Sequence, residues 1–426
     1  MPTSTDTMVE QAVAVAHALL DPERVAAALT PQAAATLSDG LAGTALLHAC
    51  LARTSPEFTT AAARHWEAAA RLRGHAPPNG IHTGPGALAA SLITGSAYLP
   101  DPASYHATTR KATAWLSARA QGLARHQKRR MDSGQPGAPW AVYDAIRGLA
   151  GIGRVLLTAH TAGYQKAAEP GLTAALTTLT ALIQTRCGSR PGWWLPASDH
   201  PESVTVHPSG AATTGLAHGI AGPLALLSIA HTAGRTVPGQ AEAIRTAAMW
   251  LLTWQEPTGS WSPCISGNDL ENPPDPGTRR LPSTSGRRNA WCYGTPGIGR
   301  ALTLAGQALD DPDLCRVGRT AVAALAERAP ARWDTEGPGL CYGSAGVLQA
   351  AAQIGCEATA RRAAEYTASH HDRQRPFGFP HLERGTAHDN PGFLSGAAGT
   401  ALALADYAGL LAPAPPASWG SLLLLA

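Results

Sequence analysis

Apolar residues recur along most of the chain at the spacing of one helix face. Long stretches that mix apolar and charged residues with a helical period are separated by shorter, almost wholly apolar runs. The long stretches are clearest at residues 9–29, 59–72, 108–123, 239–254 and 313–329. The sequence lacks runs that alternate β-branched and polar residues, as half-buried strands do. The pattern therefore predicts an all-α protein.

A glycine turn precedes each of the short apolar runs. Seven turns of the form Gly-x-x-Gly, or a close variant, start at Gly40, Gly84, Gly148, Gly219, Gly294, Gly343 and Gly396. One copy alone is commonly just a tight turn, because glycine permits backbone conformations closed to other residues. Seven copies indicate an architectural repeat. We expect the small, apolar helices to form the inner layer of a ring and the more charged helices its outer layer.

The composition argues against a nucleic-acid-binding protein. Hydrophobic residues make up 44% of the 426 residues, charged residues only 15%, and the net charge is +3. Nucleic-acid-binding proteins usually concentrate lysine and arginine on one face. The basic run at residues 125–130 is interpreted as a solvated loop or helix end, with a docking patch for an acidic peptide as the alternative. Repeat-built folds reach this length as one unit, so we expect a single domain over residues 1–426.

The N-terminus and the cysteines bear on the cellular compartment. Residues 1–11 are polar and have no basic segment before an apolar run, so we expect no secretory signal. No apolar stretch is long enough to span a bilayer. The seven cysteines are odd in number and scattered, which is typical of a reducing cytoplasm. These features predict a cytoplasmic protein with its thiols in cores or on metal.

Two cysteines occupy corresponding places in neighbouring repeats. Cys292 and Cys341 each stand two residues before a Gly-x-x-Gly turn, in the strings Trp-Cys-Tyr-Gly and Leu-Cys-Tyr-Gly. Thiols on equivalent turns can converge on one metal ion, and zinc takes thiolate and imidazole ligands. The alternative is a pair of buried structural thiols. The shared position favours the metal.

Four further residues near the turns could take part in chemistry. His218 directly precedes a turn and could move a proton near neutral pH, or could be a cap or core residue. Asp144 lies just before the third turn, where it could take part in chemistry or could serve only as a cap of the following helix. Arg288 could stabilise an enolate, or could simply be solvated. Tyr293 could donate a hydrogen bond, or could only pack beside its turn.

Two long insertions separate the third, fourth and fifth turns. Their loops, residues 187–215 and 256–289, are rich in proline and glycine. Each loop precedes a turn with candidate chemistry, so each could form a wall of a substrate groove. A disordered surface insertion is the alternative for both.

These motifs together resemble the lanthionine synthetase C-like cyclases. The resemblance is carried by residues 291–294, residues 340–343, the Gly-Leu-Ala-His-Gly run at 215–219 and the seven glycine turns, and it covers nearly the whole chain. It implies an α/α toroid, a double ring of helices built from seven helix pairs, with a catalytic zinc. Members of this family close thioether rings in ribosomally made precursor peptides that have been dehydrated.

The resemblance also implies a role for each candidate residue. Cys292 and Cys341 would be zinc ligands, and His218, Asp144, Arg288 and Tyr293 would surround the reacting groups. A zinc-bound peptide thiol would lose its proton and add to the β-carbon of dehydroalanine or dehydrobutyrine. His218 would then protonate the enolate, while Asp144 would orient His218 or help take up the thiol proton. The implied partners are a dehydrated precursor peptide and a lanthipeptide dehydratase.

One position departs from the family pattern. The family usually has histidine directly after its second zinc cysteine, as third ligand, where this sequence has Tyr342. Cys264 or His388 could substitute. A zinc-dependent cyclase is the leading hypothesis, and a non-catalytic toroid that binds a precursor peptide or a modifying enzyme is the alternative. A third hypothesis, a toroidal glycosidase, would need two facing carboxylates. Asp39 and Asp144 are the only acids just before the glycine turns, which argues against it.

Overall fold

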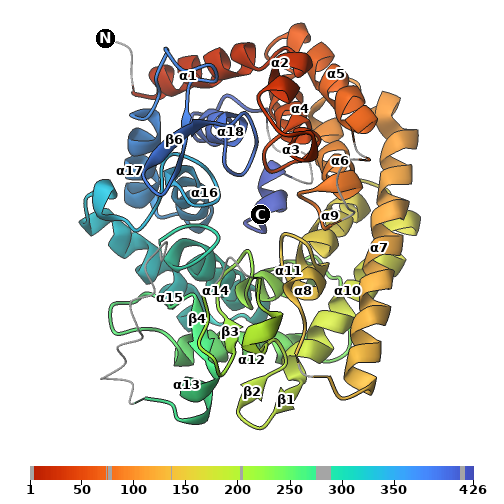
Figure 1. The fold of residues 1–426 in the computed structure, drawn as a ribbon, viewed down its shortest axis with the longest axis vertical. Coiled ribbons are helices and arrows are strands. Elements are labelled where there is room, and N and C mark those ends of the chain that lie inside the picture. The colour runs from red at the N-terminus through yellow and green to blue at the C-terminus, as the bar shows by residue number, and fades with distance from the viewer. Residues whose placement is uncertain are drawn as a thin grey trace.

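The fold is a double ring of helices (Figure 1). The computed structural model describes residues 4–72, 74, 79–135, 137–201, 205–274, 289–412 and 418–426. Within them, seven inner helices each follow one of the glycine turns: α4 (Leu41–Leu51), α6 (Gly84–Gly95), α9 (Leu149–Thr161), α11 (Ala221–Thr232), α14 (Thr295–Leu309), α16 (Ser344–Ile354) and α18 (Ala397–Tyr407). These helices are buried along most of their length, which explains why their sequences are apolar on all sides.

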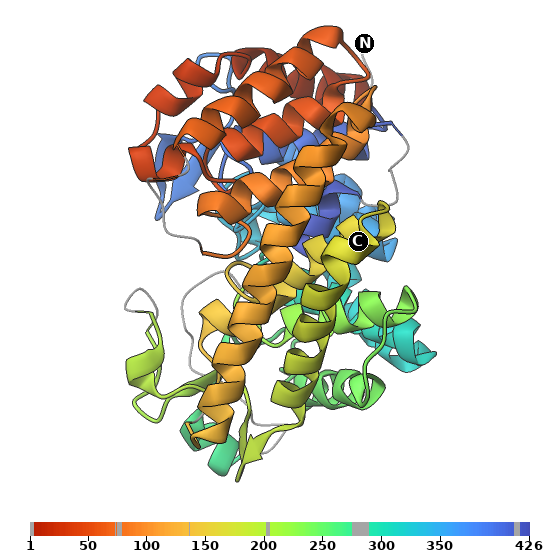
Figure 2. The ribbon, with the colours of Figure 1, turned by 90° about the vertical axis from the view of Figure 1, so that its right-hand side faces the viewer.

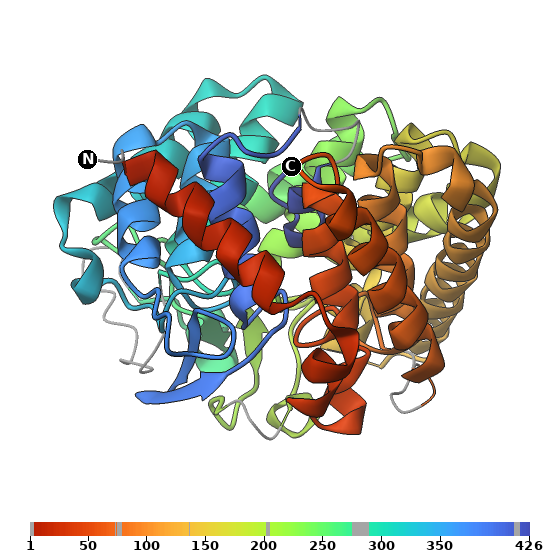
Figure 3. The same cartoon turned by 90° about the horizontal axis from the view of Figure 1, so that it is seen from above.

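The outer ring covers the inner one. Seven outer helices in the described chain each pack against the inner helix of the same pair, and most also contact the next inner helix: α5 (Pro56–Leu72), α7 (His106–Asp132), α10 (Gln165–Gln184), α12 (Gln240–Thr253), α15 (Pro312–Ala323), α17 (Glu357–Ala368) and α1 (Ser4–Ala18). The long helices α7 and α10 run side by side (Figure 2). Helix α1 closes the ring by packing on α18 (Figure 3). The predicted α/α toroid of seven helix pairs is confirmed.

Helix boundaries differ from the sequence expectation most at residues 9–29 and 313–329, and α7, expected over residues 108–123, continues to Asp132. Residues 9–29 form two helices, because Asp21 accepts a hydrogen bond from Glu23 N and caps a new helix, α2 (Pro22–Ala27). Proline at the first position of that helix cannot donate a hydrogen bond to the preceding one. At the second place, residues 313–329, helix α15 ends at Ala323 and the chain tightens into a 3₁₀ turn, Ala324–Glu327.

The seven glycine turns join into a closed ring of backbone hydrogen bonds. We number them turn 1 to turn 7: residues 37–43, 80–86, 145–151, 216–222, 291–297, 340–346 and 393–399. Each turn donates an N–H to a carbonyl of the next, at 2.8–3.4 Å: Leu37 to His82, Ile81 to Ile146, Ala145 to Ala217, Ala217 to Cys292, Cys292 to Cys341, Cys341 to Leu394, and Leu394 to Ser38. The last of these bonds returns to turn 1, so the inner-helix N-termini are held around one circle.

The second glycine of each turn lies where a side chain would collide with the backbone. A Cβ there would stand 1.8–2.5 Å from the carbonyl oxygen six residues earlier, and this holds for Gly43, Gly86, Gly151, Gly222, Gly297, Gly346 and Gly399. The glycine repeat therefore follows from close packing of each turn on its own helix. The same spacing gives every turn one register, so corresponding residues can be compared between turns.

The two long insertions meet beside turn 4. Strand β3 (Ala211–Thr213) of the first pairs antiparallel with β4 (Cys264–Ser266) of the second, and Thr213 faces Cys264. Two further hairpins of the described chain are β1 (Arg186–Cys187) with β2 (Arg190–Pro191), and β5 (Pro380–Glu383) with β6 (Thr386–Asp389). The short helices are α3 (Pro31–Ala34), α8 (Trp140–Tyr143) and α13 (Gly267–Glu271). None of the helices described is both long and apolar enough to cross a lipid bilayer.

The end of the described chain lies inside the ring. Residues 418–426, which we call the tail segment, contain the 3₁₀ helix η7 (Trp419–Leu423) and sit at the centre of the double ring (Figure 1). This segment packs against the inner helices α6 and α9. The core therefore continues from the inner helices to the axis of the toroid. The extent of the domain, residues 1–426, stays a prediction.

Candidate functional site

His218 and Asp144 form a hydrogen-bonded pair between turns 3 and 4. The Nδ1 atom of His218 lies 2.6 Å from Oδ2 of Asp144. The other carboxylate oxygen of Asp144 accepts the backbone N–H groups of Arg147 at 2.6 Å and Gly148 at 2.9 Å. Asp144 is therefore both the turn cap and the partner of the histidine. With Nδ1 held by the carboxylate, Nε2 is the nitrogen that can exchange protons with a substrate.

Surrounding side chains fix the orientation of His218. The Trp140 ring stacks on the imidazole, with centroids 4.6 Å apart and an interplanar angle of 15°. Thr213 on strand β3 donates its hydroxyl to the His218 carbonyl at 2.5 Å, and Tyr143 pairs with the same hydroxyl at 2.9 Å. Burial raises the pKa of Tyr143, so its phenol stays neutral. The His218 side chain keeps 18% of its surface exposed and is reachable from solvent.

Turn 5 brings Cys292 and Tyr293 beside His218. The Cys292 carbonyl accepts the N–H of Ala217, the residue before His218, at 3.1 Å. The Tyr293 ring lies 6.1 Å from the His218 ring, centroid to centroid. A Cβ on Gly215 would stand only 2.7 Å from the Tyr293 ring, so this glycine lets the tyrosine lie over turn 4. Burial raises the pKa of Tyr293 well above its usual value, and the thiols of Cys292 and Cys264 add to that effect.

The two candidate zinc cysteines lie on neighbouring turns. The N–H of Cys292 donates to the carbonyl of Cys341 at 3.4 Å, and Cys292 is buried while Cys341 is half-buried. The structure therefore places His218, Tyr293 and both cysteines on the adjoining turns 4 to 6, with Asp144 directly before turn 3. The roles that the resemblance implies for these residues stay predictions. Arg288 lies outside the described residues.

The donor set for a zinc ion is incomplete in the described part of the chain. No group of three His, Cys, Asp or Glu side chains there is placed to hold one metal ion. His388 lies on the exposed strand β6. Cys264 lies near Tyr293, but burial raises its pKa to about 12, which disfavours the thiolate that zinc needs. The described residues thus supply two thiols, and they do not fit a protein-held site of three ligands.

Sequence reasoning missed two residues of this region. Trp140 supports the imidazole of His218, and its place four residues before Asp144 carries no signal in the sequence. His82 stands in turn 2 at the register of His218 in turn 4, because each precedes the second glycine of its turn by four residues. Comparing the turns by register would have found His82.

Comparisons with known proteins agree with this geometry. The family model described as lanthionine synthetase C-like protein matches residues 31–414. Among solved structures, nisin cyclase is similar with a TM-score of 0.74 and 18% sequence identity, over 92% of this chain and 93% of that one. At that identity the match shows the shared fold alone. No curated protein matches the chain in sequence. Because the family match spans most of the residues, including all the turns with candidate chemistry, the chain belongs to the lanthionine synthetase C-like family.

Proposed function

We propose that the chain closes thioether rings in a peptide that carries dehydrated residues. The observation that carries this proposal is the His218–Asp144 pair, held beside Tyr293, Cys292 and Cys341 on adjoining turns. Addition of a thiol to a dehydroamino acid needs one proton removed from sulfur and one delivered to carbon. A partly exposed imidazole with a carboxylate partner suits both transfers.

In the proposed reaction, the proton removed from sulfur is the proton delivered to carbon, and side chains of this site carry it. Nε2 of His218 takes the proton of the peptide thiol, and the sulfur adds to the β-carbon of dehydroalanine or dehydrobutyrine. Asp144 stabilises the imidazolium formed, as a buried carboxylate does beside a catalytic histidine. The imidazolium then returns its proton to the α-carbon of the enolate. The neutral phenol of Tyr293 donates a hydrogen bond to the enolate oxygen.

Zinc stays a prediction from the family resemblance. Cys292 and Cys341 are the residues that would hold it, and a zinc ion would lower the pKa of a bound peptide thiol. The described residues do not complete the ligands of a zinc ion, and each step of the proposed reaction uses side chains of the protein itself. The dehydratase partner also stays a prediction.

A cyclisation assay tests the proposal directly. The substrate is a synthetic peptide with one cysteine and one dehydroalanine, and ring closure is read as loss of the alkylatable thiol at unchanged mass. We expect turnover by the wild type, and we expect loss of turnover in Cys292→Ala because that thiol is one of the two that would hold the zinc ion. Cys187→Ala changes an exposed thiol on β1 and should keep full activity. A Cys292→Ala variant as active as the wild type would contradict a role for that thiol.

A non-catalytic toroid that binds a precursor peptide is the second candidate function. Tyr342 in place of the family's usual histidine favours it, together with the missing third ligand in the described residues. Tight binding of the dehydrated peptide, without turnover and without bound metal, would select this function. Turnover above the rate of the free peptide would reject it.

A further inference from the structure

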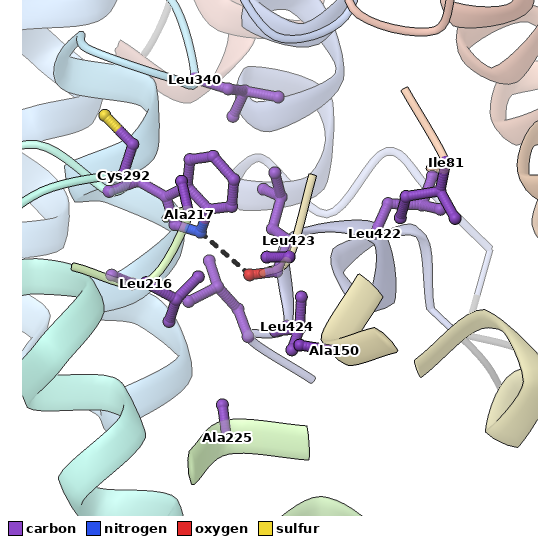
Figure 4. Close-up of a cluster of buried hydrophobic side chains, with 14 of the residues drawn as sticks. Ile81, Ala150, Leu216, Ala217, Ala225, Cys292, Leu340, Leu422, Leu423 and Leu424 are labelled. Carbon is purple, nitrogen blue, oxygen red and sulfur yellow. Dashed lines mark hydrogen bonds between the residues drawn. The ribbon is translucent and has the colours of Figure 1, made fainter. Parts of the chain in front are cut away.

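The tail segment fills the axis of the ring and is held there by inner helices. Leu422, Leu423, Leu424 and Leu425 are fully buried. Near the start of the segment, the backbone N–H of Trp419 donates to the Tyr98 hydroxyl at 3.0 Å. The close-up of this core shows the leucines surrounded by side chains from several turns (Figure 4).

Two buried arginines anchor the last residues of the segment. Arg300 on α14 donates its Nε–H to the Leu425 carbonyl at 2.7 Å, and Arg154 on α9 donates its Nε–H to the Ala426 carbonyl at 2.7 Å. Burial lowers the pKa of both guanidinium groups to about 10. A buried cation is costly unless its N–H groups are hydrogen-bonded, and these carbonyls supply such partners. The tail segment and the inner ring are thus joined by directional bonds as well as by packing.

One contact of the tail segment leads directly to the candidate site. The indole N–H of Trp291 donates to the Leu423 carbonyl at 2.9 Å (Figure 4). Trp291 is fully buried and directly precedes Cys292. The tail segment therefore holds the turn that carries Cys292 from the side of the toroid axis.

Trp291 also touches the turn that carries the second cysteine. A Cβ on Gly346, the second glycine of turn 6, would stand 2.8 Å from Cβ of Trp291. Leu340, which directly precedes Cys341, is fully buried and lies in the same cluster (Figure 4). Trp291, the first residue of turn 5, is thus packed between the tail segment and turn 6.

We infer that the tail segment is a positioning element for the cysteine pair: the Leu423 carbonyl holds Trp291, and Trp291 holds the Cys292 turn against the Cys341 turn. Neither Trp291 nor the tail segment contacts substrate in this inference. They act by limiting local opening of turn 5. The kinetic part of the inference rests on the proposed function, whereas the thiol reactivity of Cys292 does not.

The test compares Trp291→Phe with Trp333→Phe. Phenylalanine keeps an aromatic ring and removes the indole N–H. Trp333 is the matched control, because it is also buried and donates its indole N–H to a backbone carbonyl, that of Leu325, at 2.9 Å. Its ring packs against that of Tyr366 on the outer helix α17, with centroids 6.5 Å apart. The readouts are the alkylation rate of Cys292, mapped by peptide mass, with kcat, KM and Tm.

We expect Trp291→Phe to be labelled at Cys292 about fivefold to tenfold faster than the wild type, the factor that corresponds to one hydrogen bond. We expect kcat to fall by a similar factor with KM little changed. Trp333→Phe should lose comparable Tm and change neither labelling nor kcat. Equal labelling of Cys292 in the two variants would overturn the inference, even if the wild type cyclises no peptide.

A second variant loosens the tail segment from its other end. Tyr98→Phe removes the hydroxyl that accepts the Trp419 N–H and touches neither cysteine turn. We expect faster labelling of Cys292 here too, by a smaller factor than in Trp291→Phe. A lower Tm with wild-type labelling would show that the segment stabilises the fold without positioning the site.

Discussion

Turns 2 and 4 carry histidines at the same register with opposite surroundings. His218 bonds to Asp144 at 2.6 Å, stacks on Trp140 and is partly exposed. His82 is 1% exposed, and neither of its ring nitrogens has a hydrogen-bond partner among the described residues. Burial, with a smaller effect of the His218 charge, lowers the pKa of His82 to about 3. One imidazole can exchange protons, whereas the other stays neutral.

The two histidines differ because different residues stand before the turns that precede theirs in the ring, turn 3 for His218 and turn 1 for His82. Asp144 stands one residue before turn 3, and Thr36 holds the same place before turn 1. Thr36 caps its turn as Asp144 does, by accepting the N–H three residues later, that of Asp39, at 3.1 Å. A hydroxyl can replace a carboxylate as a cap, but it cannot stabilise a charged imidazole. The repeat thus places the histidine, and the neighbouring turn decides its chemistry.

The largest effect should come from removing the reactive imidazole. We expect His218→Gln to lower kcat for cyclisation by about 10²- to 10⁴-fold, the usual contribution of a general acid–base group. His82→Gln should cost less than about tenfold, because a buried neutral ring does not reach the substrate. Steady-state assays of both variants measure this, and equal losses would break the comparison.

Removing the carboxylate should have the next largest effect. We expect Asp144→Asn to lower kcat by roughly 10²-fold or more, because an amide leaves the imidazolium without its counter-charge and disturbs the tautomer. Asp39→Asn is the control, since Asp39 lies in turn 1 and binds Asn390 and Ser38 instead of a histidine. Activity of Asp144→Asn equal to that of the control would remove Asp144 from the mechanism.

The neutral histidine should show in the acid stability of the fold. The folded pKa of His82, about 3, lies below the usual 6.5, so the unfolded chain binds a proton that the folded chain does not. The stability that the neutral His82 gives the folded chain is fully present above pH 6.5 and is lost as the pH falls toward 3. Between those limits, His82→Phe should reduce the slope of unfolding free energy against pH by up to about 1.4 kcal/mol per unit.

Denaturant titrations between pH 7 and pH 5 measure that slope. His126→Phe, at an exposed histidine on α7, is the control for loss of an imidazole in general. His48 and His65 are also buried, with pKa values lowered to about 3 and about 4, so part of the acid sensitivity should remain in His82→Phe. A slope unchanged from the wild type would mean that His82 carries a proton in the folded chain.

The last prediction concerns the metal. Tyr342 stands in turn 6 at the register of His218, directly after Cys341. We expect Tyr342→His to raise zinc affinity by about tenfold or more, because the imidazole adds the third ligand that catalytic zinc sites use. Metal content of the purified proteins measures this, with Tyr342→Phe as the control. Near-stoichiometric zinc in the wild type, with no gain in Tyr342→His, would place the third ligand elsewhere.

The helical repeat could be predicted from the amino-acid sequence alone. The helical period predicted the helices, and the seven glycine turns predicted the inner ring, because a side chain at each second glycine would meet a backbone carbonyl. The motifs also singled out Cys292, Cys341 and His218, which the structure places on adjoining turns. These features are local, since each depends on residues within about two helical turns of each other.

Contacts between residues far apart in the sequence could be found only in the three-dimensional fold. It pairs Asp144 with His218 across 74 positions, and it brings the Leu423 carbonyl to Trp291 across 132. It also pairs β3 with β4, which places the Thr213 hydroxyl where it donates a hydrogen bond to the His218 carbonyl. From the sequence, a short polar residue that only caps a turn, as Thr36 does, cannot be told from one that also binds an imidazole, as Asp144 does. The closed ring of turns determines which histidine lies beside which capping residue, because it places each turn next to two others.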